Sequence, residues 1–236
     1  MRYWLVMPAA GVGRRFGSAM PKQYAPLQGR TVIEWALAPF LADPGCAGIS
    51  VCLAADDPYW GEVAERLAKR PGGTPEIIFA GGGTERSQSV RKGLEALANR
   101  ATADDWVLVH DAARPCLSSA DLQHLLERLG THRVGGILAT PASDTLKRAS
   151  ADSSIEQTVD RAGLWRALTP QMFRYQMLCD ALDRALASGR LPTDEAQALE
   201  WLGEHPLLVQ GSAANIKITS ADDLVLAAAL LNARQE

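Results

Sequence analysis

The stretch YWLVMPAAGVGRRFGSAMPKQY, residues 3–24, decides the fold. It begins with a short apolar run, Tyr3 to Met7, and passes at Pro8 into a loop of small and cationic residues. A short apolar run bounded by such a loop is typical of a buried β-strand. Ligands bind α/β sheets outside the carboxyl ends of their strands, so we predict that this first loop lines a binding site.

The alternation of apolar run and amphipathic stretch repeats along the chain. We predict strands at 3–7, 48–53, 77–80, 106–110 and 135–139, and helices at 32–41, 60–69, 85–98 and 119–129. Farther on, the pattern predicts helices at 174–187, 194–202 and 222–232 and strands at 207–210 and 216–218; Ser220 and Asp223 would form a capping box for the last helix. Repeated βαβ units predict an α/β fold with a Rossmann-like, mainly parallel twisted sheet and helices on both faces. A chain of 236 residues fits one such sheet, so we predict a single domain over 1–236.

The alternation breaks between residues 140 and 168. Short β-like pieces at 145–148 and 155–159 flank a polar tip at 150–154, which predicts a protruding β-hairpin arm over about residues 141–163. A lone hairpin is marginal in water, so the arm needs a surface to lie on. A second subunit is the economical candidate, and packing on its own domain is the alternative.

Composition excludes several classes of protein. The formal net charge of −3 argues against a general polyanion binder, so any anion site must be local and no nucleic-acid partner is expected. The cysteines and histidines are scattered and match no zinc-ligand spacing, which indicates reduced thiols in the cytoplasm. We find no signal-peptide core and no apolar stretch long enough to span a membrane, so no membrane partner is expected.

The loop after the first strand has the character of a polyphosphate cradle. Its small residues let backbone N–H groups approach a phosphate, and Arg14, Arg15 and Lys22 add cations without any acidic residue. A dinucleotide fingerprint fails because Phe16 stands at the third glycine position, and a P-loop would need lysine at Gly17. A basic surface loop remains the alternative.

A second glycine-rich loop, residues 81–83, follows the third predicted strand. Successive glycines suggest backbone pressed against a flat ligand such as a base, which Ser89 could bond from the first helical turns. A flexible loop with Thr84 as helix cap explains the same residues equally well.

A carboxylate stands at the tip of the fourth predicted strand. Asp111 is the candidate for holding Mg²⁺, which prefers carboxylate oxygen together with substrate phosphates. The planar fork of Arg114 suits a second phosphate group. An ordinary ion pair between Asp111 and Arg114 is the alternative.

Together these loops resemble the 4-diphosphocytidyl-2-C-methyl-D-erythritol synthases, the cytidylyltransferases of the non-mevalonate isoprenoid pathway. The resemblance covers essentially the whole chain. It rests on Pro8-Ala-Ala-Gly-x-Gly-Arg-Arg, Pro21-Lys-Gln-Tyr, Gly82-Gly-x-x-Arg86-x-x-Ser89-Val, His110-Asp-Ala-Ala-Arg-Pro115, Asp144-Thr-Leu-Lys147, Leu168-Thr-Pro-Gln171, Thr193-Asp-Glu195 and Asn215-Ile-Lys-Ile-Thr219.

The resemblance implies a nucleotidyltransferase fold and a reaction in which 2-C-methyl-D-erythritol 4-phosphate attacks the α-phosphorus of CTP and pyrophosphate leaves. It also implies Mg²⁺ and a homodimer whose arms complete the neighbouring sites. The implied catalytic residues are Arg15, Lys22, Arg161 and Lys217. The implied nucleotide site comprises Ala9, Ala10, Gly11, Gly82, Thr84, Ser89 and the metal-binding Asp111, and the acceptor site comprises Arg114, Thr145, Arg161, Thr193 and Lys217.

Some positions depart from the family pattern. Thr84 stands where some relatives carry aspartate, and Ala213 and Ala214 stand where some carry an acidic residue. Thr193 also suits the N-cap of a helix. Two rival functions share the CTP loops: a cytidylyltransferase acting on a pentitol phosphate such as ribitol 5-phosphate, and a non-catalytic nucleotide-sensing module. The pairing of Arg15 with Lys22 favours catalysis, because binding alone does not require cations aimed at the reacting phosphorus.

Overall fold

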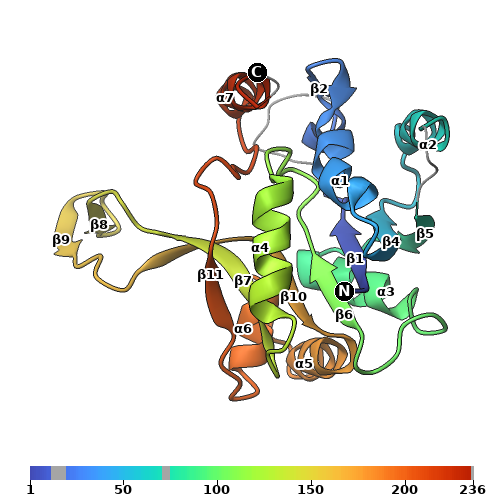
Figure 1. Ribbon diagram of the computed structural model, residues 1–236. Coiled ribbons are helices and arrows are strands. Elements are labelled where there is room, and N and C mark those ends of the chain that lie inside the picture. The colour runs from blue at the N-terminus through green and yellow to red at the C-terminus, as the bar shows by residue number, and fades with distance from the viewer. Residues whose placement is uncertain (12–19, 71–74, 235–236) are drawn as a thin grey trace.

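A seven-stranded sheet forms the centre of the computed structural model, which describes residues 1–11, 20–70 and 75–234. The strand order is β11-β7-β10-β6-β1-β4-β5. The bounds are β1 (Tyr3–Pro8), β4 (Cys46–Leu53), β5 (Glu76–Gly81), β6 (Trp106–Val109), β7 (Gly135–Pro141), β10 (Trp165–Arg174) and β11 (Leu207–Gln210). Neighbouring strands run parallel except at β10, which is antiparallel to both β6 and β7. The predicted α/β fold with a mainly parallel sheet is confirmed (Figure 1).

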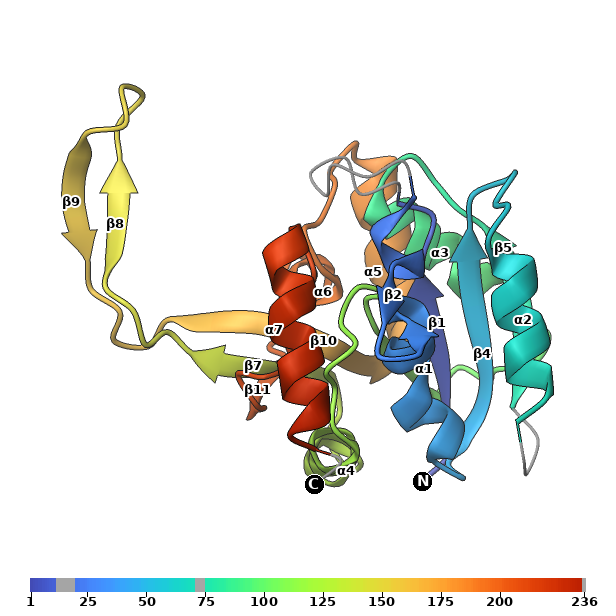
Figure 2. The same ribbon diagram turned by 90° about the horizontal axis from the view of Figure 1, so that it is seen from above.

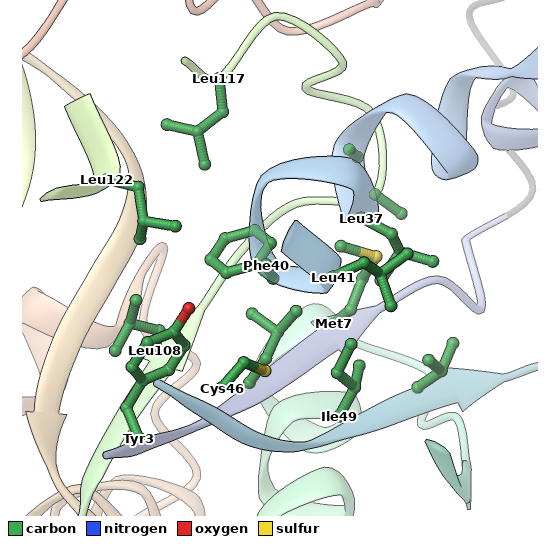
Figure 3. Close-up of a cluster of buried hydrophobic side chains, with 14 of the residues drawn as sticks. Tyr3, Met7, Leu37, Phe40, Leu41, Cys46, Ile49, Leu108, Leu117 and Leu122 are labelled. Atoms are coloured by element: carbon green, nitrogen blue, oxygen red, sulfur yellow. The ribbon is translucent and has the colours of Figure 1, made fainter. Parts of the chain in front are cut away.

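Helices cover both faces of this sheet, as predicted. They are α1 (Val32–Ala42), α2 (Trp60–Ala68), α3 (Arg86–Glu95), α4 (Ser119–Leu129), α5 (Tyr175–Ala187), α6 (Glu195–Glu200) and α7 (Ala221–Asn232). Side chains of β1 alternate between two cores because successive residues of a strand point to opposite faces. Tyr3 and Met7 pack with α1, α2 and α4, whereas Trp4 and Val6 pack with α3, α5 and α6. Figure 3 shows the first of these cores.

The last helix belongs to a third, smaller core. Leu231 of α7 packs with Leu27 of β2 (Pro26–Leu27), a strand that pairs with β3 (Arg30–Thr31), and with Ile218. Ser220 and Asp223 form the predicted capping box of α7. This core ties the segment before α7 to the segment after the first loop.

The predicted arm is an antiparallel hairpin of β8 (Leu146–Ala149) and β9 (Ile155–Val159). It projects from the body on extensions of β7 and β10, as Figure 2 shows. Its side chains are exposed along nearly the whole hairpin, and Ile155 is 67% exposed. The arm therefore does not pack on its own domain, which was the alternative to a second subunit.

Several local predictions are wrong. The ten-residue strand β10 was not predicted, because Thr169, Pro170 and Gln171 interrupt its apolar run. The segment 216–218 is not a strand. It contacts the loop after β6, where the Ile218 N–H donates to the Ala113 carbonyl.

The alternative interpretation of Thr84 and Thr193 as helix caps is also wrong. Glu85, rather than Thr84, is the N-cap of α3 and forms a capping box with Gln88. Asp194, rather than Thr193, is the N-cap of α6 and accepts a hydrogen bond from the Gln197 N–H. In each case the cap is the residue that follows the threonine, and its carboxylate accepts a hydrogen bond from a free backbone N–H group of the first helical turn. None of the helices in the described ranges is long and apolar enough to cross a membrane.

Candidate active site

A pocket of about 450 Å³ lies past the carboxyl ends of the strands, where the three predicted loops meet. The predicted site residues that line it are Ala9, Ala10, Gly11, Lys22, Thr84, Ser89, Asp111 and Lys217. Predicted residues from four segments distant in sequence therefore share one pocket. Arg14 and Arg15 lie outside the described residues, so their proposed place beside this pocket remains a prediction.

A second pocket of about 240 Å³ adjoins the first. Arg114 and Thr193, both predicted on the acceptor side, line it. Arg86, Asp111 and Lys217 line both pockets, so these three side chains form a wall between them. Two molecules bound in the two pockets would meet at this wall.

Residues 9–11, which follow β1, are held in place by η2 (Lys22–Tyr24). The Gln23 side-chain amide donates to the carbonyls of Ala9 at 2.7 Å and Gly11 at 3.1 Å. The Lys22 ammonium donates to the Ile218 carbonyl at 2.8 Å. Gln23 is buried, so these bonds are shielded from water and preorganise the loop.

Gly82 is required by the protein itself. A Cβ at this position would collide with the Ala10 side chain and lie 3.1 Å from the Leu53 carbonyl oxygen, to which the Gly82 N–H donates. Only glycine lets the two loops approach this closely. The sequence suggested a flat ligand as the reason for these glycines, and the structure supplies contact between loops as a second reason.

Ser89 shapes the glycine loop from within α3. Its hydroxyl accepts from the Gly83 N–H at 2.9 Å and donates to the Glu85 carbonyl at 3.2 Å. The side-chain amide oxygen Oε1 of Gln88 accepts from both the N–H and the hydroxyl of Thr84. The hydroxyls of Ser89 and Thr84 therefore stabilise the glycine loop through hydrogen bonds within the protein.

Asp111 lies at the centre of a charged network in the wall. It is 7% exposed. Its Oδ1 accepts from Arg86 Nε at 2.9 Å, and its Oδ2 lies 2.9 Å from Lys217 Nζ and 3.6 Å from Arg114 Nε. Burial raises the pKa of Asp111, but Arg86, Lys217 and Arg114 outweigh it and hold the pKa far below its ordinary value. Asp111 is therefore ionised at neutral pH.

Arg114 is engaged mainly within the protein. Its Nη1 donates to the Asn215 carbonyl at 2.7 Å, and Asn215 in turn donates to the Thr169 carbonyl at 2.7 Å. The predicted ion pair with Asp111 is present but long. Arg114 thus holds the segment 215–217 next to the strand ends through its bond to Asn215. Its side chain also lines the second pocket.

The wall residues fit a divalent cation held through Asp111. Among the described residues, no group of three or more His, Cys, Asp or Glu side chains could hold a metal alone. Mg²⁺ usually needs only one or two carboxylates when substrate phosphates supply the other oxygens. A carboxylate offers about four acceptor sites. Arg86 and Lys217 occupy two of those on Asp111, so room for a cation remains.

Comparison with known proteins identifies the family. The family model for 2-C-methyl-D-erythritol 4-phosphate cytidylyltransferase matches residues 3–233. The chain belongs to this family. The enzyme of that name from Ectopseudomonas mendocina is 53% identical over 94% of this chain and 93% of its own length. The one from Halorhodospira halophila is 52% identical over 99% of this chain and 96% of its own length.

Solved structures of cytidylyltransferases in this family share the fold. A crystal structure of 4-diphosphocytidyl-2C-methyl-D-erythritol synthase superposes with a TM-score of 0.83 at 38% identity, covering 98% of this chain and 100% of that one. The Francisella tularensis 2-C-methyl-D-erythritol 4-phosphate cytidylyltransferase gives 0.81 at 34% identity, with coverage of 98% and 100%.

Two predicted residues of the cytidylyltransferase site lie away from both pockets. Thr145 and Arg161 belong to the exposed arm and its base, and neither lines either of the two pockets described above. The Arg161 guanidinium donates to the Ser143 carbonyl. One copy of the chain therefore does not bring these side chains to Asp111.

Sequence analysis missed two charged residues of this site. Arg86 and Glu195 pair 109 positions apart in the chain, across the starts of α3 and α6. Both stand in the motifs that carry the family resemblance, and that is the signal that could have found them. A charged residue in a first helical turn is ordinarily solvent-exposed, so the full burial of Glu195 and the partial burial of Arg86 are visible only in the folded chain.

His110 provides a pH-dependent contribution to stability beside the site. Its ring is fully buried between the Arg114 carbonyl and the Thr169 hydroxyl. Burial lowers the pKa of His110 to about 4, against an ordinary value of 6.5, so the folded protein holds it neutral. Between these values the unfolded chain binds the proton and the folded one does not. The free energy of unfolding is therefore unaffected by protonation of His110 above about pH 6.5 and falls as the pH drops below that value, by up to about 3 kcal/mol.

Urea denaturation between about pH 7 and about pH 4.5 measures this effect. We expect the free energy of unfolding of the wild type to fall more steeply than that of His110→Gln, whose side chain does not titrate. Equal slopes for the two proteins would show that His110 does not contribute.

Proposed function

We propose that this chain transfers CMP from CTP to 2-C-methyl-D-erythritol 4-phosphate, forming 4-diphosphocytidyl-2-C-methyl-D-erythritol and pyrophosphate in non-mevalonate isoprenoid precursor biosynthesis. The observation that carries the proposal is the pair of pockets that meet at Arg86, Asp111 and Lys217. The larger pocket, framed by the glycine loop and the loop after β1, receives CTP. The smaller one receives the phosphorylated acceptor.

In this mechanism an oxygen of the acceptor phosphate forms a bond to the α-phosphorus of CTP, and the bond from that phosphorus to the bridging oxygen of pyrophosphate breaks. Little covalent work falls to the protein, so positioning and fixed positive charge must supply the rate. Lys22 and Arg15 stabilise the charge that develops on the α-phosphate. Lys217 and Arg161 hold the attacking phosphate, and Arg114, Thr145 and Thr193 position the rest of the acceptor.

Mg²⁺ would be held by Asp111 together with phosphate oxygens of the nucleotide. When bound, it would neutralise charge on the triphosphate. The backbone of Ala9 to Gly11 and residues Gly82, Thr84 and Ser89 would bind the cytidine. Ser89 is already bonded within the glycine loop, which favours a role for it in holding that loop against the base.

We further propose a cytoplasmic homodimer in which residues 1–236 form a single domain with the arm at about 141–163. Exposed apolar side chains of the arm and of the adjoining start of β10 support the dimer: Leu146 and Ile155 in the arm, and Leu164 and Trp165 beside it. An arm with this much uncovered apolar surface is expected to bind a partner. The four cysteines are buried as free thiols, which supports a reducing compartment.

A pyrophosphate-release assay with two acceptors tests the function. With CTP and Mg²⁺, we expect pyrophosphate release with 2-C-methyl-D-erythritol 4-phosphate as acceptor. With ribitol 5-phosphate, kcat/KM should be at least about 10²-fold lower than with that acceptor. Preference for ribitol 5-phosphate would support the pentitol phosphate alternative. CTP binding without turnover on either acceptor would support a nucleotide-sensing module.

A further inference from the structure

Glu195 is a fully buried carboxylate for which the proposed mechanism assigns no role. It opens α6 and is 0% exposed. Its Oε1 accepts from Arg86 Nη1 at 2.5 Å, and its Oε2 accepts from Arg86 Nη2 at 3.0 Å. Both terminal nitrogens of Arg86 therefore face Glu195, and only Nε faces Asp111, at 2.9 Å.

This division of one guanidinium between two carboxylates has a chemical consequence. Arginine ordinarily binds a carboxylate bidentately, through two parallel N–H bonds that engage both oxygens. Here Glu195 accepts that bidentate contact, so Asp111 accepts only a single hydrogen bond from Arg86, from Nε to Oδ1. Asp111 thereby keeps acceptor capacity on the side of the nucleotide pocket, which it also lines.

We infer that Glu195 is a positioning residue for the reaction: by binding both terminal nitrogens of Arg86, it prevents Arg86 from engaging Asp111 bidentately and keeps Asp111 available to a divalent cation that arrives with the nucleotide. The inference rests on the proposed binding of metal and CTP at this site. It assigns to Glu195 no contact with either substrate.

A purely structural role explains the pair less well. A buried ion pair is often no more stabilising than apolar residues of similar volume, so stability alone gives little reason to place two charges here. Moreover, Arg91 already ties α3 to α5 through Asp183, with bonds of 2.6 and 3.0 Å. That pair has the same fork geometry in an exposed position and does not reach Asp111, so it provides a matched control.

The test measures binding of Mn²⁺ in the presence of CTP and without acceptor, by electron paramagnetic resonance of the free ion. We expect Glu195→Gln to weaken Mn²⁺ binding by about 10- to 100-fold, the usual effect of losing a residue that orients a metal ligand. Asp183→Asn should leave it unchanged. In the double variant Arg86→Gln with Glu195→Gln, the competing guanidinium is gone, and we expect binding to return to within about threefold of wild type.

The outcomes separate the inference from the function on which it rests. Failure of the wild type to bind Mn²⁺ with CTP would overturn the metal site and the inference with it. Wild-type binding with an unchanged, folded Glu195→Gln protein would overturn the inference alone, as would a double variant as weak as Glu195→Gln. Thermal unfolding checks each variant. If Glu195→Gln does not fold, the double variant decides: wild-type-like binding supports the inference, and loss of binding by the folded protein overturns it.

Discussion

Lys22→Ala is expected to slow CMP transfer by about 10² to 10³-fold, which corresponds to about 2.7 to 4 kcal/mol of lost transition-state stabilisation. Lys22 lines the nucleotide pocket, and its ammonium is held against the Ile218 carbonyl at 2.8 Å. An ammonium fixed in this way costs little reorganisation when charge develops on the α-phosphate. Alanine removes the charge and leaves residues 9–11 in place, because the Gln23 side chain still binds the carbonyls of Ala9 and Gly11.

Steady-state pyrophosphate release at saturating CTP measures this loss, and calorimetric titration of CTP separates it from weaker binding. Lys69→Ala is the matched control, because Lys69 is exposed at the end of α2 and lines neither pocket. Turnover of Lys22→Ala at the wild-type rate would remove Lys22 from the mechanism. A loss confined to KM would assign it to binding of the ground state.

Mixing two inactive variants should restore activity if the sites are shared between subunits. Lys22 lines the nucleotide pocket in the body of the chain, whereas Arg161 stands at the base of the arm, which projects from the body in Figure 2, and lines neither pocket. In a hybrid of Lys22→Ala and Arg161→Ala, one site combines an intact body with an intact arm. Random exchange makes half of the dimers hybrid, so we expect about a quarter of wild-type activity, starting from two nearly inactive proteins.

The control mixes Lys22→Ala with Lys217→Ala. Both changes lie in the body of the same site, so every site of that hybrid carries one defect and no recovery is expected. Native mass spectrometry of differently tagged chains verifies that subunits exchange. If exchange occurs and Lys22→Ala with Arg161→Ala stays inactive, each chain builds its site without its neighbour's arm.

Local pattern was enough to predict most of the sheet and the three loops that form the pocket. The strands β1, β4 and β6 are apolar runs followed by small or charged residues, and a buried strand must be apolar on both faces. The predicted strand β5 is present but lies at the sheet edge and is partly exposed, so its burial was predicted wrongly. Lys22 and Asp111 follow from the same logic, whereas Lys217 follows from the family motifs alone, and the structure brings all three to one pocket. The arm was also predictable, since its polar tip interrupts the alternation of strands and helices.

Contacts between segments distant in sequence decided the features that local pattern did not predict, namely the strand β10 and the pairing of Arg86. The strand β10 carries Thr169, Pro170 and Gln171 at its centre, and what makes this stretch a strand is pairing with β6 and β7 on either side. The sequence by itself determined which loops carry the chemistry, because charge, size and apolar periodicity are properties of neighbouring residues. Only the tertiary structure decided that Arg86 divides its fork between Glu195 and Asp111, because the electrostatic free energy of a buried charge depends on partners brought there by folding.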